Sequence, residues 1–317
     1  MSFKKLTLIS FILVVLMTGI ITPTMAQEFT IGFSQMENNM PFRIAETNSI
    51  KNIEEKYPEV DVIVTDAQSS LSKQISDCMD LISRGVDILA IAPREYEGFQ
   101  TVFDAAKEKD IPVILVDREA KGVPGEDFET MIGANFWYEG RQAAVYLSAK
   151  MEGEGNIVEL IGTAGSSVAR DREGGFHQVV EYFPDMKIIA SQPADFTRME
   201  ALNVMENIIQ QHNDKIDAVY AHNDEMALGA IQALNAAGMV DDVLIVSIDG
   251  QKSAIKSIMD GNLDASIECP PYFGDILYET SKKILNGEDI PPKVTITDAR
   301  IFTKANAEYH YDRDSEF

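Results

Sequence analysis

From Phe29 onward, short apolar runs alternate with longer amphipathic segments along the chain. This alternation is typical of βαβ units, which build a parallel sheet with helices on both faces. The predicted strands of the first half are 29–33, 60–65, 88–92 and 113–116, and the helices between them are 44–57, 71–83 and 99–109. The first half is therefore predicted to form one doubly wound α/β domain.

A turn-rich loop at 121–126 and a short apolar segment at 131–133 separate this half from a second series of strands and helices. The predicted strands are 157–161, 187–191, 218–220, 244–248 and 265–267, and the predicted helices are 140–151, 171–182, 199–211, 225–237 and 253–260. Gly238 and Gly261 stand where helix C-caps are expected. The fold class predicted is thus α/β, with two doubly wound parallel-sheet domains.

The elements after the second series predict how the two domains are joined. A helix pattern at 273–285 and short strands at 294–296 and 301–302 would have no sheet to join if the domains followed one another as beads. We therefore expect a hinge of three crossings, near 133–135, 268–270 and 298–301. The predicted lobes are 27–133 with 270–298 for the N-terminal lobe, and 135–268 with 301–317 for the C-terminal lobe.

The N-terminus has the pattern of an export signal. Lys4 and Lys5 precede the uncharged stretch 6–21, and Thr24-Met25-Ala26 forms a small-residue cleavage site, so residues 1–26 are predicted to be a signal peptide. The alternative is a membrane anchor, but the apolar run is short for a span. We expect a periplasmic, monomeric protein with no stable membrane insertion after cleavage.

Composition excludes some partners and leaves one question open. The formal net charge of -24 disfavours binding to nucleic acid and to anionic lipid. Cys78 falls in a helix pattern and Cys269 at a strand end, so the sequence leaves open whether they form a disulfide or stay free. The four histidines and two cysteines show no metal-ligand spacing, and no cofactor or metal is expected.

Polar side chains gather where the predicted strands end, which is where open α/β sheets bind ligands. The candidate ligand-binding residues are Asn39, Phe42, Arg43, Asp117, Arg118, Arg172, Asn223 and Asp249. Carboxylates, an amide and guanidinium groups match the vicinal hydroxyls of a sugar, and Phe42 offers an aromatic face for its C–H groups. This mixture predicts a monosaccharide site between the lobes.

Each of these residues also has a structural interpretation. Asp249 precedes Gly250 and a helix, so it could serve as a helix cap. Arg118 and Arg172 each follow an aspartate, which is compatible with surface ion pairs. Phe42 could belong to the core of the first helix. The site is predicted because all of these side chains fall at one edge.

The motifs at the strand ends carry a family resemblance. The chain resembles the periplasmic substrate-binding proteins of ABC sugar importers, in the ribose-binding-like group, and is similar within it to the galactofuranose binders. The matching segments include 31–35, 116–118, 171–172, 220–224 and 247–250. The resemblance implies the type I periplasmic binding protein fold and sugar contacts from the predicted site residues. It also implies delivery of a galactofuranose-like sugar, or another pentose or hexose, to ABC transporter permease subunits.

The chain departs from the pattern of the galactofuranose binders in the first loop, where Glu37-Asn38-Asn39-Met40-Pro41 replaces a Gly/Ser-rich stretch and Phe42 stands in place of Trp.

Other functions remain as alternatives. An enzyme is disfavoured because the chain has no nucleophile elbow, dinucleotide fingerprint or phosphate loop. A transcription regulator would carry a DNA-reading domain where this chain has its export signal. A receptor that feeds a sensor kinase or chemoreceptor stays open.

Overall fold

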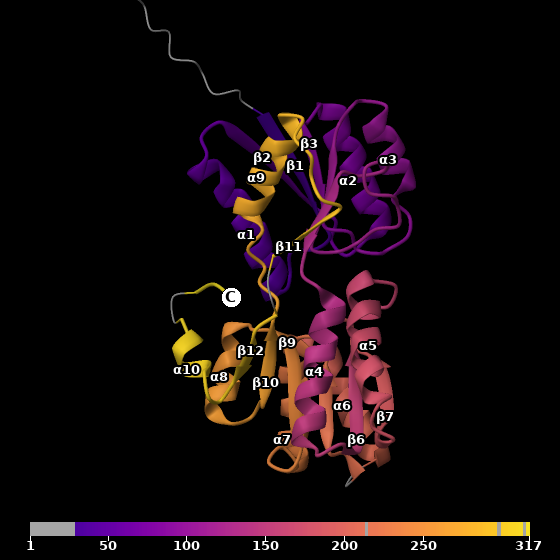
Figure 1. Ribbon diagram of the computed structural model, residues 1–317, viewed down its shortest axis with the longest axis vertical. Coiled ribbons are helices and arrows are strands. Elements are labelled where there is room, and N and C mark those ends of the chain that lie inside the picture. The colour runs from indigo at the N-terminus through magenta and orange to yellow at the C-terminus, as the bar shows by residue number, and fades with distance from the viewer. Residues whose placement is uncertain (1–28, 213–214, 297–298, 313–314) are drawn as a thin grey trace, which may run out of the picture.

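The computed structural model describes residues 29–212, 215–296, 299–312 and 315–317 of the 317-residue chain. Two lobes are stacked along the long axis of the molecule, each built on its own sheet (Figure 1). The predicted signal peptide, residues 1–26, lies outside the described residues.

The N-lobe is built on a parallel sheet of strand order β11-β5-β4-β3-β1-β2. Its strands are β1 (Phe29–Gln35), β2 (Val60–Asp66), β3 (Ile88–Ile91), β4 (Val113–Val116), β5 (Thr130–Gly133) and β11 (Lys293–Thr295). Its helices are α1 (Pro41–Lys56), α2 (Leu71–Arg84), α3 (Gln100–Lys107) and α9 (Gly274–Leu285). Every residue of β3 and β4 is buried, as expected for strands covered on both faces.

The C-lobe repeats this plan with the strand order β12-β10-β9-β8-β6-β7. Its strands are β6 (Glu154–Ile161), β7 (Asp185–Pro193), β8 (Ala218–Ala221), β9 (Leu244–Asp249), β10 (Ala265–Glu268) and β12 (Ile301–Thr303). Its helices are α4 (Phe136–Lys150), α5 (Ser167–Val180), α6 (Arg198–His212), α7 (Asp224–Ala237), α8 (Lys252–Asp260) and α10 (Ala307–His310). The predicted fold class of two doubly wound α/β domains is confirmed.

The chain passes from one sheet to the other between β5 and β6, between β10 and β11, and between β11 and β12. These passages match the expected crossings, although residues 297–298 of the third lie outside the described part of the chain. The C-lobe sheet is not purely parallel, since its edge strand β12 runs antiparallel to β10. The exact lobe boundaries given above stay a prediction.

Two helices begin earlier than their apolar periodicity predicts, because their first turns are set by capping. Asn135 accepts from the backbone N–H of Tyr138 and starts α4 at Phe136. Ser166 accepts from the N–H of Ala169 and starts α5 at Ser167. Caps of this kind satisfy backbone donors that the first turn leaves unpaired.

Close contact between α4 and α5 depends on glycine. A Cβ atom on Gly140 would lie 2.1 Å from the carbonyl oxygen of Arg172, and one on Gly175 would lie 2.0 Å from the carbonyl oxygen of Trp137. Both distances are far below van der Waals contact, so only glycine lets the two backbones approach this closely. The approach sets α5, which carries Arg172, directly against α4, which carries Glu139.

Both cysteines are free and buried, Cys78 on α2 and Cys269 just after β10. Burial raises the pKa of the Cys78 thiol to about 12, so it stays protonated. The question left open by the sequence is answered by two free thiols.

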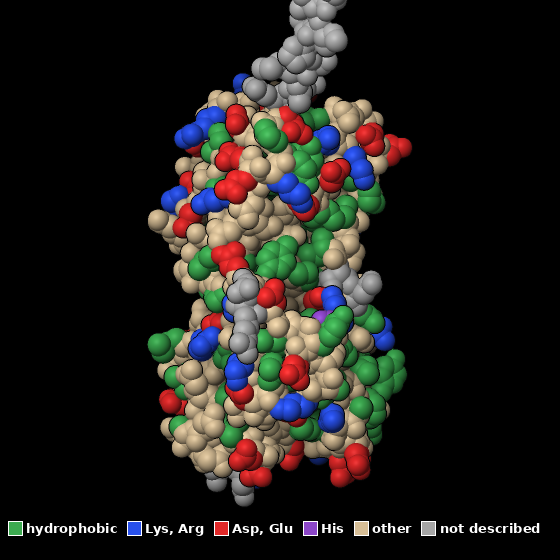
Figure 2. Space-filling view, turned by 90° about the vertical axis from the view of Figure 1, so that its left-hand side faces the viewer, with side chains coloured by type: hydrophobic (Ala, Val, Ile, Leu, Met, Phe, Trp, Pro, Cys, Tyr) green, Lys and Arg blue, Asp and Glu red, His purple; other side chains and the backbone are tan. Residues whose placement is uncertain are grey.

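Surface features agree with the composition. On the face in Figure 2, acidic and basic side chains are interspersed over both lobes. Within the described residues, no helix combines the length and apolar character needed to cross a membrane.

Candidate functional site

The N-lobe part of the site is built around Arg43, on the first turn of α1. Its guanidinium donates to Glu46 Oε2 at 2.7 Å and to Asp117 Oδ2 at 2.6 Å. Asp117 follows β4 directly and has a φ of 63°. Burial lowers the pKa of Arg43, but Asp117 and Glu46 more than offset it, so the net shift is upward and the guanidinium stays charged.

The C-lobe part is built around Arg172, on α5. Its Nε donates to Glu139 Oε2 at 3.0 Å, its Nη2 to Asp249 Oδ1 at 3.4 Å, and its Nη1 to the carbonyl oxygen of His222. Asp249 ends β9 with a φ of 134°. Burial raises the pKa of Asp249 and of Glu139, while Arg172 opposes both shifts.

These two groups face one small cavity between the lobes. The lining residues are Met40, Phe42, Arg43, Asp117 and Arg118 from the N-lobe, and Val168, Arg172, Phe196, Asn223 and Asp249 from the C-lobe.

The structure brings all predicted site residues except Asn39 to this cavity. Asn39 is exposed just before α1 and does not line the cavity. Arg118 and Arg172 are each only 3% exposed, which excludes surface ion pairs as their role. Asp249 does not cap α8, whose N-cap is Gln251.

Asn223 combines a structural role with its place in the cavity. Its side-chain oxygen accepts from the N–H of Met226 and caps α7, and its amide nitrogen donates to the carbonyl oxygen of Phe196 at 3.1 Å. These bonds fix the orientation of the amide. One amide hydrogen and one oxygen lone pair remain for a ligand.

The sequence analysis did not single out Met40, Val168 or Phe196. Phe196 has a φ of 61°, and its ring covers Gly162, where a Cβ atom would lie 1.9 Å from the ring. The Arg118 guanidinium lies 5.4 Å from the centroid of the same ring. Phe196 lies beyond the carboxyl end of β7, and this position is the one sequence feature that could have indicated it as a site residue.

Arg118 has an incomplete set of hydrogen bonds within the cavity. Its Nη1 donates to the carbonyl oxygen of Arg94 at 3.2 Å, but its buried Nε has no hydrogen-bond partner. Burial and the nearby Arg43 lower its pKa to about 9, although Asp117 Oδ2 lies 3.7 Å from this Nε. An acceptor oxygen on a ligand would complete this set of bonds.

The chemistry of the cavity lining matches a polyhydroxylated molecule. Guanidinium donors and carboxylate acceptors line it, and Phe42 and Phe196 provide aromatic faces.

The lobes also touch beside the cavity. The N–H of Glu119, in the N-lobe, donates to Ser167 Oγ at 2.9 Å, and the N–H of Tyr96 donates to the carbonyl oxygen of Gly165 at 3.1 Å. Arg170 forms an ion pair with Glu119 at 3.1 Å. These contacts hold the lobes together around the cavity.

The fold and the site together define the class of the protein. Two doubly wound lobes joined by three crossings, with a cavity lined by charged side chains between them, are typical of a two-lobed ligand-binding protein.

Comparison with known proteins agrees with this class. The family model described as periplasmic binding protein domain matches residues 31–289, and the chain belongs to this family of sugar-binding proteins. It is 37% identical over 270 residues to the ribose import binding protein RbsB of Bacillus subtilis, covering 85% of this chain and 86% of that protein. It is 35% identical over 294 residues to the galactofuranose-binding protein YtfQ of Escherichia coli, covering 91% and 92%.

A solved structure is similar over both lobes. The periplasmic binding protein of the arabinose ABC transporter from Shewanella sp. ANA-3, bound to α- and β-L-arabinofuranose, superposes with a TM-score of 0.86. It is 36% identical, and the match covers 89% of this chain and 94% of that one. The type I periplasmic binding protein fold expected from the motifs is thereby confirmed.

Proposed function

We propose that this chain is exported, captures one monosaccharide between its lobes and delivers it unaltered to the permease subunits of an ABC importer. The observation that carries the proposal is the shared cavity, to which Arg43 comes from one lobe and Arg172 and Asp249 from the other. A ligand that bonds to all three requires both lobes at once, so it favours the closed arrangement.

The ligand we propose is a neutral pentose or hexose, galactofuranose-like in ring form. Arg43 and Arg172 are each already paired with two carboxylates, which disfavours an anionic group next to them. The relatives named for galactofuranose and the structure with bound arabinofuranose support a furanose ring.

The site residues we assign are Phe42, Arg43, Asp117, Arg118, Arg172, Asn223 and Asp249, with Phe196 added as a second aromatic face. Arginine forks bind adjacent hydroxyls, the aspartates accept from them, and the rings cover the apolar face of the sugar. Arg118 gains the acceptor that its Nε lacks.

The test is a thermal-shift screen of the purified chain against pentoses and hexoses, including sugars that populate furanose forms. A stabilising sugar is then titrated by calorimetry and recovered for mass spectrometry. We expect one sugar per chain, returned unmodified. Chemical conversion of the sugar, or a screen in which no sugar raises the melting temperature, contradicts the proposal.

Export is tested on the same protein. We expect material released from the periplasm to begin at Gln27, as read by intact-mass spectrometry. A periplasmic product that retains residues 1–26 contradicts signal cleavage.

A further inference from the structure

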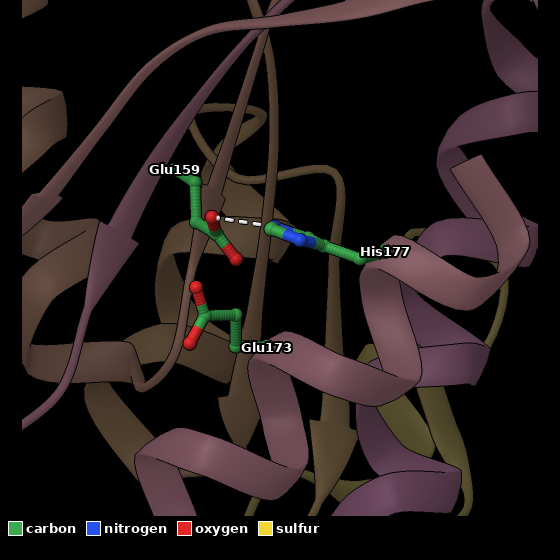
Figure 3. Close-up of side chains that lie close together, drawn as sticks. All are labelled: Glu159, Glu173 and His177. Atoms are coloured by element: carbon green, nitrogen blue, oxygen red, sulfur yellow. Dashed lines mark hydrogen bonds and ion pairs between the residues drawn. The ribbon is translucent and has the colours of Figure 1, made fainter. Parts of the chain in front are cut away.

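A second cluster of potential ligand atoms lies away from the sugar cavity, between β6 and α5. It consists of Glu159 on β6, and Glu173 and His177 on α5 (Figure 3). Glu173 and His177 are four residues apart, so they lie one helical turn apart on the same face of α5. The ligand atoms of the three residues all lie within 4.8 Å of one another.

Glu159 is a buried carboxylate whose two oxygens have different surroundings. Oε1 accepts from His222 Nε2 at 3.2 Å, whereas Oε2 faces α5 and lies 2.9 Å from His177 Nε2. Ser191 Oγ also donates to Oε2, at 2.6 Å.

His222 is held as a donor to Glu159. The N–H of Gly162 donates to its Nδ1 at 3.4 Å, so the proton of the neutral ring lies on Nε2, which faces Glu159. His222 therefore fixes the orientation of the Glu159 carboxylate, as hydrogen-bond partners of carboxylate ligands do around metal ions.

Glu173 is the member of the cluster whose position no hydrogen bond accounts for. Its half-buried carboxylate faces that of Glu159, as Figure 3 shows, and among the described residues it has neither a hydrogen-bond nor an ion-pair partner. A negative group next to a buried carboxylate is stabilised when a cation lies between them.

We propose that Glu159, Glu173 and His177 bind a divalent cation, with Zn²⁺ as the ion that best matches the site. Two carboxylates and one imidazole form the mixed oxygen and nitrogen set that Zn²⁺ accepts, and the two carboxylates balance its charge. His177 binds through Nε2, so its ring carries a proton only on Nδ1, and a proton held on Nε2 leaves to solvent. A fourth position stays open to water.

The spacing analysis of the sequence pointed to no metal, because it considered histidines and cysteines only, and the fold brings Glu159 to Glu173, 14 residues further along the chain. The proposal is independent of the sugar. The bound ion would join β6 to α5, the helix that also carries Arg172.

The test is calorimetric titration of chelator-washed, untagged, sugar-free protein with ZnCl₂ alone. We expect one bound Zn²⁺ per chain and a higher melting temperature with Zn²⁺. The substitutions Glu173→Gln and His177→Gln are expected to weaken binding by at least about tenfold each. Both residues are partly exposed, so these variants should fold, which their melting temperatures without Zn²⁺ check.

Matched controls separate this site from general affinity of surface groups for zinc. Glu206→Gln removes an exposed acid of α6, and His212→Gln removes a histidine of the same helix, both outside the cluster. Both are expected to keep the wild-type affinity. Absence of Zn²⁺ binding to the wild-type chain overturns the proposal, and so does binding that survives in Glu173→Gln and His177→Gln.

Discussion

Arg43 and Arg172 occupy equivalent positions in the two lobes. Each is a buried arginine held between a glutamate on a helix and an aspartate at the end of a strand. Both aspartates, Asp117 and Asp249, have positive φ angles. The doubly wound fold thus places the same pair of groups at one cavity twice, and an ion pair joins the two members of each pair.

The close approach of α4 to α5 gives a prediction for Gly140→Ala. The new methyl group would lie 2.1 Å from the Arg172 carbonyl oxygen, so the helices must separate. We expect a loss of unfolding free energy of about 3 kcal/mol and weaker sugar binding, because Arg172 moves with α5.

Chemical denaturation and sugar titration measure both effects. Val145→Ala is the control, since Val145 is exposed on α4, and it should change stability by less than about 0.5 kcal/mol. Wild-type stability in Gly140→Ala contradicts the glycine-dependent packing.

A contact between the lobes predicts an effect on affinity without loss of a cavity residue. Ser167→Ala removes the acceptor of the Glu119 N–H, at the side of the cavity. Losing this hydrogen bond destabilises the closed form by about 1 kcal/mol, which corresponds to roughly fivefold weaker sugar binding.

Calorimetry checks this against Ser83→Ala, an exposed serine at the end of α2 that is expected to have no effect. Equal affinities of the two variants would argue against a role for this contact in closure.

The raised pKa of Asp249 predicts pH-dependent binding. Burial raises the pKa of this carboxyl above its ordinary value of 3.8, so the sugar-free protein holds a proton there over a wider pH range. A sugar hydroxyl that donates to Asp249 requires the ionised form, so binding releases this proton. Affinity should therefore rise with pH from above the ordinary aspartate range until Asp249 is ionised in the free protein.

Titrations between about pH 5 and about pH 8, in buffers of different ionisation enthalpy, measure the released proton. In Asp249→Asn we expect weaker binding and loss of this pH dependence. Affinity that rises as the pH falls has the opposite sign and contradicts the assignment.

The first loop predicts a contrast between neighbouring positions. Phe42 lines the cavity, whereas Asn39 is exposed and does not. Phe42→Ala is expected to weaken sugar binding by about 1–2 kcal/mol through loss of the aromatic face, and Asn39→Ala to leave it unchanged. Titration of both variants tests this, and equal losses would place Asn39 in contact with the sugar.

The sequence alone predicted the fold and most of the cavity for identifiable reasons. Asp117 and Asp249 were found because parallel strands bring their carboxyl ends to one edge, so position along a strand defines position in space. Phe196 was not found, since it lies in an irregular turn whose φ of 61° no periodicity reports.

The sequence also did not predict which side chains from different elements contact one another. The glutamates that form ion pairs with the two arginines could not be assigned from it. Glu139 reaches Arg172 only because Gly140 and Gly175 let two helices touch. Likewise, Glu159 meets His177 only through the packing of α5 on the sheet.

The central claim is that one sugar is held by both lobes at once. Calorimetric titration of Arg43→Lys and Arg172→Lys with the sugar selected by the screen tests it most directly. Lysine keeps the charge but loses the planar fork, so each variant should bind at least about tenfold more weakly than the wild type. Wild-type affinity in either variant, with the fold intact, would mean that the sugar is held by one lobe alone.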